Sequence, residues 1–295
     1  MYQSLSRYTD NFVLYVLCLD AQTYQILNQM QCPKMILVPL SDLEKADPEL
    51  LSVKNSRSKI EYYFTCTASF GYYIFNQYQN VKFLTYLDAD TYFFSTPIYF
   101  LDILQGASIA ITPHRFPTTK KDHEKYGVYN VGWVSFKRDY NGMCCLEDWR
   151  TDCLNWCHAY LEGDRFGDQK YLDAWPTRYE NVKIIDHFGV NAGPWNLECA
   201  SLTLEKDCIL INNEPLILYH FHSLSRLINR VYCLGLCEYS VEINPILRRR
   251  IYSHYIHQVK ITHNKLQNRT LPRFGMPTKK FSYRNFLSPR DILCV

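Results

Sequence analysis

Apolar runs alternate with segments of helical composition along the first part of the chain. The run 12–19 (FVLYVLCL) ends at Asp20, and a shorter apolar run spans 34–40. Residues 21–31, between the two runs, have helical composition. Apolar runs of this length are typical of strands buried on both faces, and strands that alternate with helices are typical of βαβ units. The pattern predicts an α/β fold with a mixed, mostly parallel sheet flanked by helices.

A long amphipathic helix and a third strand follow. The apolar positions of the helix recur at three- and four-residue steps, which places them on one face. They are Ile60, Tyr63, Phe64, Thr67, Gly71, Ile74, Phe75 and Tyr78. The run 81–87 (VKFLTYL) predicts a buried strand that ends at Asp88-Ala89-Asp90. Further strands are predicted at 108–111 and 131–136, with an exposed polar loop at 117–126 between them. A second amphipathic helix is marked by Trp149, Cys153, Trp156, Cys157 and Tyr160.

Composition narrows the class of protein. The chain has 295 residues, of which 47% are hydrophobic, and this supports a large core. Its formal charge of +3 is too balanced for nucleic acid to be the main partner. Several of the twelve cysteines lie inside apolar segments, where they are typical of small buried side chains. The first residues lack the pattern of a secretory signal, and no apolar run approaches the length of a membrane span. We therefore expect a cytoplasmic protein.

Asp88 and Asp90 are the first candidates for chemistry. In an open parallel sheet, ligands bind outside the carboxyl ends of the strands. Two carboxylates at that edge can hold Mg²⁺ or Mn²⁺ against a substrate phosphate. A short Asp-x-Asp also arises by chance, but its position at the end of an apolar strand favours a metal site.

His220 and His222 are the second candidates. In a strand, both imidazoles point to the same face, because side chains alternate with period two. One imidazole added to two aspartates gives a mixed nitrogen and oxygen ligand set that suits Mn²⁺ better than Ca²⁺. A histidine near apolar residues is more often an ordinary hydrogen-bonded side chain, so this ligand role depends on the pairing with Asp88 and Asp90.

Other polar segments are unspecific when each is taken alone. Asp168, in Gly167-Asp168-Gln169, is compatible with a simple helix cap. Tyr129-Asn130-Val131-Gly132 is compatible with a turn that enters a strand. His187-Phe188-Gly189 and Gly193-Pro194-Trp195-Asn196 have the composition of loops.

Taken together and in this order, these segments resemble the nucleotide-sugar glycosyltransferases of the GT-A fold, especially the glycogenin-like and lipopolysaccharide galactosyltransferase-like family. The resemblance spans 12–224. Its motifs are a first strand that ends in Asp20, Tyr86-Leu87-Asp88-Ala89-Asp90-Thr91, Tyr129-Asn130-Val131-Gly132, Gly167-Asp168-Gln169-Lys170-Tyr171-Leu172 and the late His220-Phe221. The Tyr-Leu-Asp-Ala-Asp motif is the most specific of them.

The resemblance implies a role for each matched residue. Asp88 and Asp90 match the metal-binding pair, His220 matches the third protein ligand of Mn²⁺ or Mg²⁺, and His222 is the alternative ligand. The other implied roles concern the nucleotide-sugar. Asp20 would contact the base and ribose, Arg57 or Lys59 would contact the diphosphate or sugar, and Ala89 and Asn130 would line the donor cleft. Asp168 would bind the sugar hydroxyls, and Gln169 would lie beside the anomeric carbon.

The resemblance also implies a reaction. It points to transfer of a hexose from a nucleotide-sugar, with UDP as the expected nucleotide, to a glycan or glycolipid acceptor such as lipopolysaccharide or capsule. It implies retention of configuration, and front-face substitution is preferred because Asp168 and Gln169 are poor candidates for a nucleophile. Two alternatives stay open, a sugar nucleotidyltransferase and a non-catalytic carbohydrate-binding protein. A sugar nucleotidyltransferase would require a glycine-rich phosphate-binding loop after the first strand, and 18–23 (CLDAQT) has no glycine.

The sequence departs from the family after His220. The family continues towards Gly and Lys-Pro-Trp, whereas Ser223-Leu224 follows here. The expected phosphate-binding lysine is therefore absent from the motif, and Arg226 or Arg230 is its candidate replacement. This departure indicates a divergent branch of the family.

The chain is expected to divide into a catalytic domain and an extension. We predict a GT-A domain at 1–243, with a nucleotide-sugar half at 12–112 and an acceptor half at 127–224. The extension, 244–295, mixes basic residues with aromatic and aliphatic ones at roughly helical spacing. Such a segment can contact an anionic membrane surface peripherally, or it can be an ordinary helix on the catalytic domain, and the sequence leaves both open.

Overall fold

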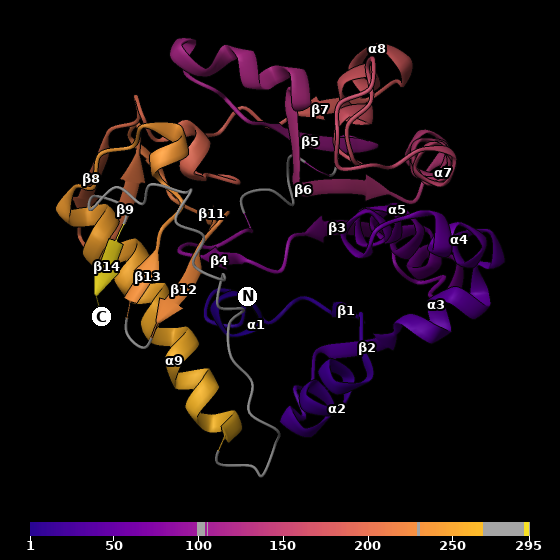
Figure 1. Ribbon diagram of the computed structural model, residues 1–295, viewed down its shortest axis with the longest axis horizontal. Helices are drawn as coiled ribbons and strands as arrows, with labels where there is room; N and C mark the ends of the chain where they lie inside the picture. Colours follow the sequence, from indigo (N-terminus) through magenta and orange to yellow (C-terminus); the bar gives the residue numbers. More distant parts are fainter. Residues whose placement is uncertain (99–103, 105, 229–230, 268–291, 295) are drawn as a thin grey trace.

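A computed structural model describes residues 1–98, 104, 106–228, 231–267 and 292–294 (Figure 1). Its largest sheet has four strands in the order β3-β6-β5-β7. These are β3 (Phe83–Leu87), β6 (Tyr129–Lys137), β5 (Ile109–Pro113) and β7 (Val182–Ile184). Strand β6 runs antiparallel to both β3 and β5, whereas β7 runs parallel to β5.

The first strands form a separate pair. Strand β1 (Leu14–Cys18) runs parallel to β2 (Met35–Pro39), and α2 (Ala21–Met30) connects them. Asp20 caps α2, because its carboxylate accepts a hydrogen bond from the Thr23 amide at 2.7 Å. The strand, helix and strand predicted for 12–40 are confirmed. Four of the five residues of β1 are half-buried instead of fully buried, since β1 pairs with β2 alone among the described strands.

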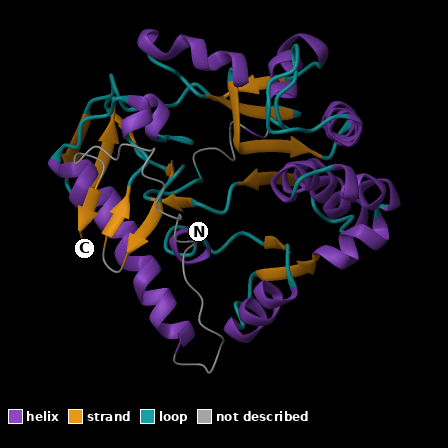
Figure 2. Ribbon diagram, viewed as in Figure 1, coloured by secondary structure: helices purple, strands orange, loops and turns teal. Residues whose placement is uncertain are grey.

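Two long helices cover the four-stranded sheet. Helix α5 (Lys59–Gln77) begins with a capping box formed by Ser58 and Glu61 and packs beside α7 (Tyr140–Asn155) (Figures 1 and 2). Their apolar faces and the inner face of β5 and β6 form one core, which includes Ala68, Phe75, Ile109, Ile111, Val134, Phe136, Leu146, Trp149 and Trp175. The helix predicted from Ile60 is confirmed, and the second helix ends at Asn155, before the predicted Tyr160.

Smaller sheets complete the second half of the molecule. Strand β4 (Thr91–Phe93) pairs with β11 (Leu218–His220), and Figure 1 shows both near the middle of the structure. The remaining strands are β8 (Leu202–Glu205), β9 (Cys208–Ile211), β10 (Glu214–Pro215), β12 (Ser225–Ile228), β13 (Val231–Cys233) and β14 (Ile292–Cys294). They surround a second core that includes Trp195, Tyr219, Phe221, Leu234, Ile251, Tyr252 and Ile256.

Short helices connect these parts. The α-helical ones are α1 (Tyr2–Leu5), α3 (Leu40–Ala46), α4 (Pro48–Val53) and α8 (Trp175–Arg178). The 3₁₀-helices span Lys54–Ser56, Thr118–Tyr126, Lys170–Ala174, Pro194–Asn196 and Cys237–Tyr239. The C-terminal extension contains a π-helical turn, Leu247–Tyr252, that leads into α9 (Ser253–Gln267), so the predicted helical spacing is confirmed there. The predicted polar loop at 117–126 is a half-exposed 3₁₀-helix.

The predicted mixed α/β fold is confirmed, but the described sheets are less parallel than expected. Only the β1–β2 and β5–β7 pairs run parallel. The reason is the connection from β5 to β6, which lacks a crossover helix over the sheet and therefore returns the chain antiparallel. No described helix has both the length and the apolar character that crossing a bilayer requires.

Candidate metal centre

The pairing of β4 with β11 brings two distant segments together. The chain leaves β3 at Leu87, turns through 88–90 and enters β4 at Thr91. The Thr91 hydroxyl donates to the Asp88 carbonyl oxygen at 2.8 Å, which fixes the turn. In the ladder, Thr91 lies opposite His220, and the Phe221 amide donates to the Asp90 carbonyl oxygen at 2.9 Å. The sheet register therefore places the imidazole beside both carboxylates.

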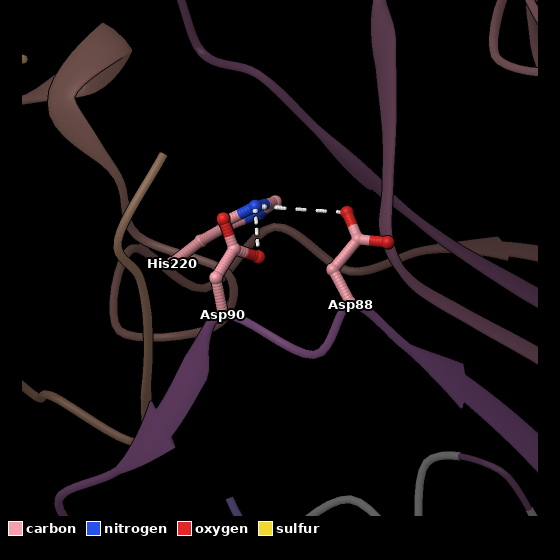
Figure 3. A group of neighbouring side chains, drawn as sticks. All are labelled: Asp88, Asp90 and His220. Atoms are coloured by element: carbon pink, nitrogen blue, oxygen red, sulfur yellow. Dashed lines mark ion pairs between the residues drawn. The ribbon is translucent and has the colours of Figure 1, made fainter. Parts of the chain in front are cut away.

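Three candidate ligand groups converge at this turn. His220 Nε2 lies 3.0 Å from Asp90 Oδ1 and 3.6 Å from Asp88 Oδ2 (Figure 3). One ligand atom from each of the three side chains lies within 4.8 Å of the others. Around an ion with bonds of about 2.1 Å, octahedral ligand atoms lie about 3 to 4.2 Å apart. The spacing of the three groups is therefore close to that of a shared coordination sphere.

Burial and charge act differently on the three groups. Burial lowers the pKa of His220, but the hydrogen bond and charge of Asp90 outweigh burial and raise it overall. Burial raises the pKa of Asp90, but the hydrogen bond and charge of His220, together with a backbone hydrogen bond and the His222 charge, outweigh burial and lower it overall. The pKa of Asp88 is raised by burial and by the neighbouring Asp90, against the opposite effect of His220. The site thus holds two carboxylates that one imidazole only partly neutralises.

A buried network of side-chain amides lies behind His220. Asn130 Nδ2 donates to His114 Nε2 at 3.0 Å and to Gln169 Oε1 at 3.2 Å. Gln169 Nε2 in turn donates to the Tyr126 carbonyl oxygen at 3.2 Å. His114 is held by its Nδ1 contact with the Val128 carbonyl oxygen, and burial lowers its pKa to about 3. His114 therefore stays neutral and can accept the Asn130 hydrogen bond near neutral pH.

Asn191 and Gly132 complete this network. Asn191 Nδ2 donates to Asn130 Oδ1 at 2.7 Å and to Thr112 Oγ1 at 2.9 Å. A Cβ built on Gly132 would lie 2.6 Å from Asn130 Oδ1, 2.6 Å from His220 Nδ1 and 2.7 Å from Asn191 Oδ1. The three polar atoms therefore converge on one point, and only glycine leaves them room. His220 Nδ1 and Asn191 Oδ1 are buried without a hydrogen-bond partner among the described residues.

Asp168 lies behind Asp88 in a buried position. Its side chain has a hydrogen bond to Thr67, and its carbonyl oxygen accepts a hydrogen bond from Trp149 Nε1 at 2.8 Å. Burial raises the pKa of Asp168 to about 7, and the Asp88 carboxylate adds to the shift. Asp168 and the half-buried Gln169 follow Gly167, whose φ of 54° is left-handed.

The structure brings some of the predicted site residues together and leaves others apart. Asp88, Ala89, Asp90, Asn130, Asp168, Gln169 and His220 belong to the turn, the buried network or their immediate surroundings. His222 is outside the group whose ligand atoms lie within 4.8 Å of one another. Its ring centroid lies 6.1 Å from that of His220, and it contacts the Trp195 ring.

The residues predicted to contact the nucleotide have other local partners. Asp20 caps α2, and the nearby Lys59 charge is among the causes that lower its pKa, after its hydrogen bonds to Thr23. Arg57 Nη1 contacts His158 Nε2 at 3.0 Å, and Arg57 Nη2 donates to the Leu154 carbonyl oxygen at 3.1 Å. Among the candidate replacements for the missing lysine, Arg226 is in β12, and Arg230 lies outside the described residues. The nucleotide-binding roles of Asp20, Arg57 and Lys59 stay predictions.

Sequence reasoning missed His114 and Asn191. His114 directly follows β5, so the rule that placed Asp88 at a strand end would also have found His114. Asn191 stands two residues before the Gly193-Pro194-Trp195-Asn196 segment, which the sequence suggests is a loop.

Comparison with known proteins gives two relatives in Bacillus subtilis (strain 168), and no family model matches the chain. The uncharacterized protein YfnF is 30% identical over 229 residues, which cover 75% of this chain and 75% of YfnF. The chain belongs to the same family as YfnF. The uncharacterized protein YfnD is 28% identical over 271 residues, 91% of this chain and 86% of YfnD.

One solved structure has a remote likeness to this member of the YfnF family. The apo form of mouse xyloside xylosyltransferase 1 superposes with a TM-score of 0.46 at 13% identity, over 75% of this chain and 90% of that chain. A likeness this remote carries no argument about activity.

Proposed function

We propose that this protein is a metal-dependent glycosyltransferase that moves a hexose from a nucleotide-sugar, with UDP as the expected nucleotide, to a glycan or glycolipid. The observation that carries the proposal is the convergence of Asp88, Asp90 and His220 from two segments far apart in the chain. The ordered motifs that resemble GT-A glycosyltransferases support it, because the converging residues are the ones that those motifs match.

The donor set fits a divalent cation such as Mn²⁺ or Mg²⁺. Two carboxylates and one imidazole form a mixed oxygen and nitrogen set, which suits Mn²⁺. His220 Nδ1 faces away from the carboxylates into the protein, so Nε2 is the nitrogen available to a cation. When bound here, a cation supplies Lewis-acid stabilisation of the negative charge that develops on a leaving diphosphate.

The other residues of the site bind and orient the donor sugar in this proposal. Asp168 accepts or donates a hydrogen bond at a sugar hydroxyl, since its raised pKa of about 7 keeps both protonation states accessible. Asn130 and Tyr126 hold both ends of the Gln169 carboxamide, which fixes its position beside the anomeric carbon. A group held this way loses little freedom when substrate binds. We propose retention of configuration by front-face substitution, because none of these side chains is an activated nucleophile.

The proposal is tested by a screen of nucleotide-sugars for Mn²⁺-dependent hydrolysis in the absence of acceptor. We expect slow release of nucleoside diphosphate from one or a few UDP-sugars, and loss of this release in EDTA. Nucleoside triphosphate consumption with pyrophosphate release would instead identify a sugar nucleotidyltransferase. Sugar binding without metal-dependent nucleotide binding would identify a carbohydrate-binding protein. Either result contradicts the proposal.

We also propose that 1–243 is the catalytic domain, with a donor half at 12–112 and an acceptor half at 127–224. In this proposal 244–295 is an accessory extension, and it rests on the cytoplasmic face of a membrane. Arg248, Arg249 and Arg250 are exposed on the π-helical turn, and Arg250 forms an ion pair with Asp207 at 2.6 Å. Exposed arginines attract anionic lipid headgroups. Flotation with liposomes that contain anionic lipid tests this idea, and the same flotation by an Arg248→Glu/Arg249→Glu variant removes it.

A further inference from the structure

The two ring nitrogens of His220 have different surroundings. Its Nε2 contacts Asp90 and Asp88, whereas its Nδ1 is buried without a partner among the described residues. A histidine that binds a metal almost always donates its other ring N–H to an acceptor, which fixes the tautomer and the ring orientation. Full engagement of His220 with a cation therefore needs an acceptor for the Nδ1–H.

The structure offers two oxygen atoms at the right place. A Cβ atom added to Gly132 would lie 2.6 Å from His220 Nδ1. The same point lies 2.6 Å from Asn130 Oδ1 and 2.7 Å from Asn191 Oδ1. Asn130 Oδ1 already accepts hydrogen bonds from the Gly132 amide at 2.8 Å and from Asn191 Nδ2 at 2.7 Å. A carbonyl oxygen has two lone pairs, so both are in use. Asn191 Oδ1, in contrast, has no partner among the described residues.

The position of Asn191 Oδ1 is fixed by the opposite end of the same amide. Asn191 Nδ2 donates to Thr112 and to Asn130, and a planar carboxamide with a fixed nitrogen has a fixed oxygen. The backbone places the residue beside His220, because the His220 amide donates to the Ala192 carbonyl oxygen at 2.7 Å. Asn191 is fully buried, at 0% exposure, so bulk solvent does not reach its oxygen.

We propose that Asn191 is a positioning residue of the metal centre: its side-chain oxygen receives the Nδ1–H of His220 and keeps the Nε2 lone pair directed at the cation. No direct hydrogen bond joins the two atoms in this structure, and His220 Nε2 lies 3.0 Å from Asp90 Oδ1. The proposal requires the imidazole to turn so that its Nδ1–H points at Asn191 Oδ1; both atoms border the same point beside Gly132. This inference rests on the proposed metal-dependent function.

The chain offers a matched control. Asn196 is also a buried asparagine, at 4% exposure, in the same segment. Its Nδ2 donates to the His114 carbonyl oxygen at 3.2 Å, and its Oδ1 accepts from the Gly193 amide at 3.2 Å. Loss of the Asn196 amide therefore removes a comparable number of buried hydrogen bonds without removing an acceptor for His220.

The experiment is isothermal titration of the full chain with Mn²⁺, together with thermal unfolding in EDTA. We expect Asn191→Ala to weaken Mn²⁺ binding by about 10- to 100-fold, the range typical of lost partners of metal-ligating histidines. We expect Asn196→Ala to lower the melting temperature by a similar amount and to keep wild-type Mn²⁺ affinity. Asn191→Asp retains the oxygen and the size, and we expect it to bind Mn²⁺ more tightly than Asn191→Ala.

The contradicting outcomes are distinct. Equal loss of affinity in Asn191→Ala and Asn196→Ala, or wild-type affinity in Asn191→Ala, overturns the role of Asn191 and leaves the metal centre standing. If Asn191→Ala does not fold, Asn191→Ser decides, because wild-type Mn²⁺ affinity in that variant, which also lacks the amide oxygen, overturns the role. A wild-type chain that binds no Mn²⁺ overturns the metal-dependent function itself.

Discussion

The two sides of the candidate metal centre are built differently. At the front, the side chains of Asp88 and Asp90 are 31% and 49% exposed, and the Asp90 carboxylate contacts His220 Nε2 at 3.0 Å. At the rear, the His220 side chain is only 6% exposed, and Asn130 and Asn191 behind it are buried. The difference indicates that folding alone fixes the side chains at the rear. The carboxylates at the front, in contrast, gain their full set of contacts when a ligand binds.

This difference also separates stability from function. Two neighbouring carboxylates repel each other in the metal-free protein, and the raised pKa of Asp88 reflects burial together with that repulsion. At the rear, both polar atoms of the Asn130 side-chain amide and the Nδ2 of Asn191 have hydrogen-bond partners, and these buried bonds stabilise the fold. Substitutions at the front should therefore change binding and activity, and substitutions at the rear should also change stability.

The largest expected effect is on activity at the front. Asp90→Ala removes a ligand group, so we expect it to lower transfer or donor hydrolysis by about 1,000-fold or more, on the scale of electrostatic groups that act on a leaving group. The melting temperature in EDTA should stay close to that of the wild type. Asp42→Ala is the matched control, because the Asp42 side chain is 48% exposed and its contacts with Lys45 and the Ser41 hydroxyl, both at 3.5 Å, lie on the surface. Wild-type activity in Asp90→Ala would contradict the assignment.

The next largest effect is a pH dependence of the unfolding free energy that comes from Asp168. The folded pKa of about 7 lies above the ordinary 3.8, so between these values the folded protein holds a proton that the unfolded chain has lost. The contribution of Asp168 to stability is therefore present below about pH 4 and is lost as the pH rises towards 7. Relative to Asp168→Asn, the wild type should lose up to about 4 kcal/mol of unfolding free energy across this window.

The measurement is denaturant unfolding of both proteins in EDTA at several pH values. The difference between the two free energies isolates Asp168 from the other titrating groups. Two parallel pH curves would show that Asp168 has no raised pKa.

A smaller loss of stability is expected when an added methyl group overpacks the buried side chains behind His220. The added methyl group of Gly132→Ala would lie within 2.7 Å of Asn130, Asn191 and His220 atoms, so these buried side chains must shift. Overpacking of this kind costs about 1 to 3 kcal/mol. Gly106→Ala is the control, since among the described residues no atom beyond its chain neighbours lies within 4 Å of its added carbon. Chemical denaturation of the three proteins measures the effect, and equal stability of Gly132→Ala and Gly106→Ala would show that the rear is adaptable.

The smallest change in metal-free stability is expected for a substitution of Asp88. Asp88→Asn removes one of two repelling carboxylates and retains an acceptor for the Tyr86 hydroxyl, which donates to Asp88 Oδ1 at 2.8 Å. We expect the melting temperature in EDTA to stay the same or rise by a few degrees, and the stabilisation by added Mn²⁺ to be lost. A variant that is destabilised in EDTA would place Asp88 among the structural residues, with the rear network.

The sequence predicted the front of the site better than the rear. Asp88 and Asp90 directly follow an apolar run, so a local pattern was enough to place them at a strand end. His220 was predicted as a candidate ligand from its alternation with His222 and then from its family motif, and the β4–β11 register brings it to the carboxylates.

The rear depends on contacts that no local pattern contains. Asn191 reaches its place because Arg115 holds the preceding loop, with Nη2 donating to the Val190 carbonyl oxygen at 2.7 Å and to the His187 carbonyl oxygen at 3.0 Å. Arg115 is more than seventy residues away in the chain. The sheet arrangement was also beyond local patterns, since an apolar run predicts a strand without predicting the direction of its neighbour.

The most direct test of the central claim is anomalous diffraction from crystals of the full chain grown with MnCl₂. We predict one strong peak within bonding distance of the Asp90 carboxylate and His220 Nε2, with Asp88 beside it. A well-ordered turn at 88–90 without a peak, or manganese bound only at other residues, would contradict the account.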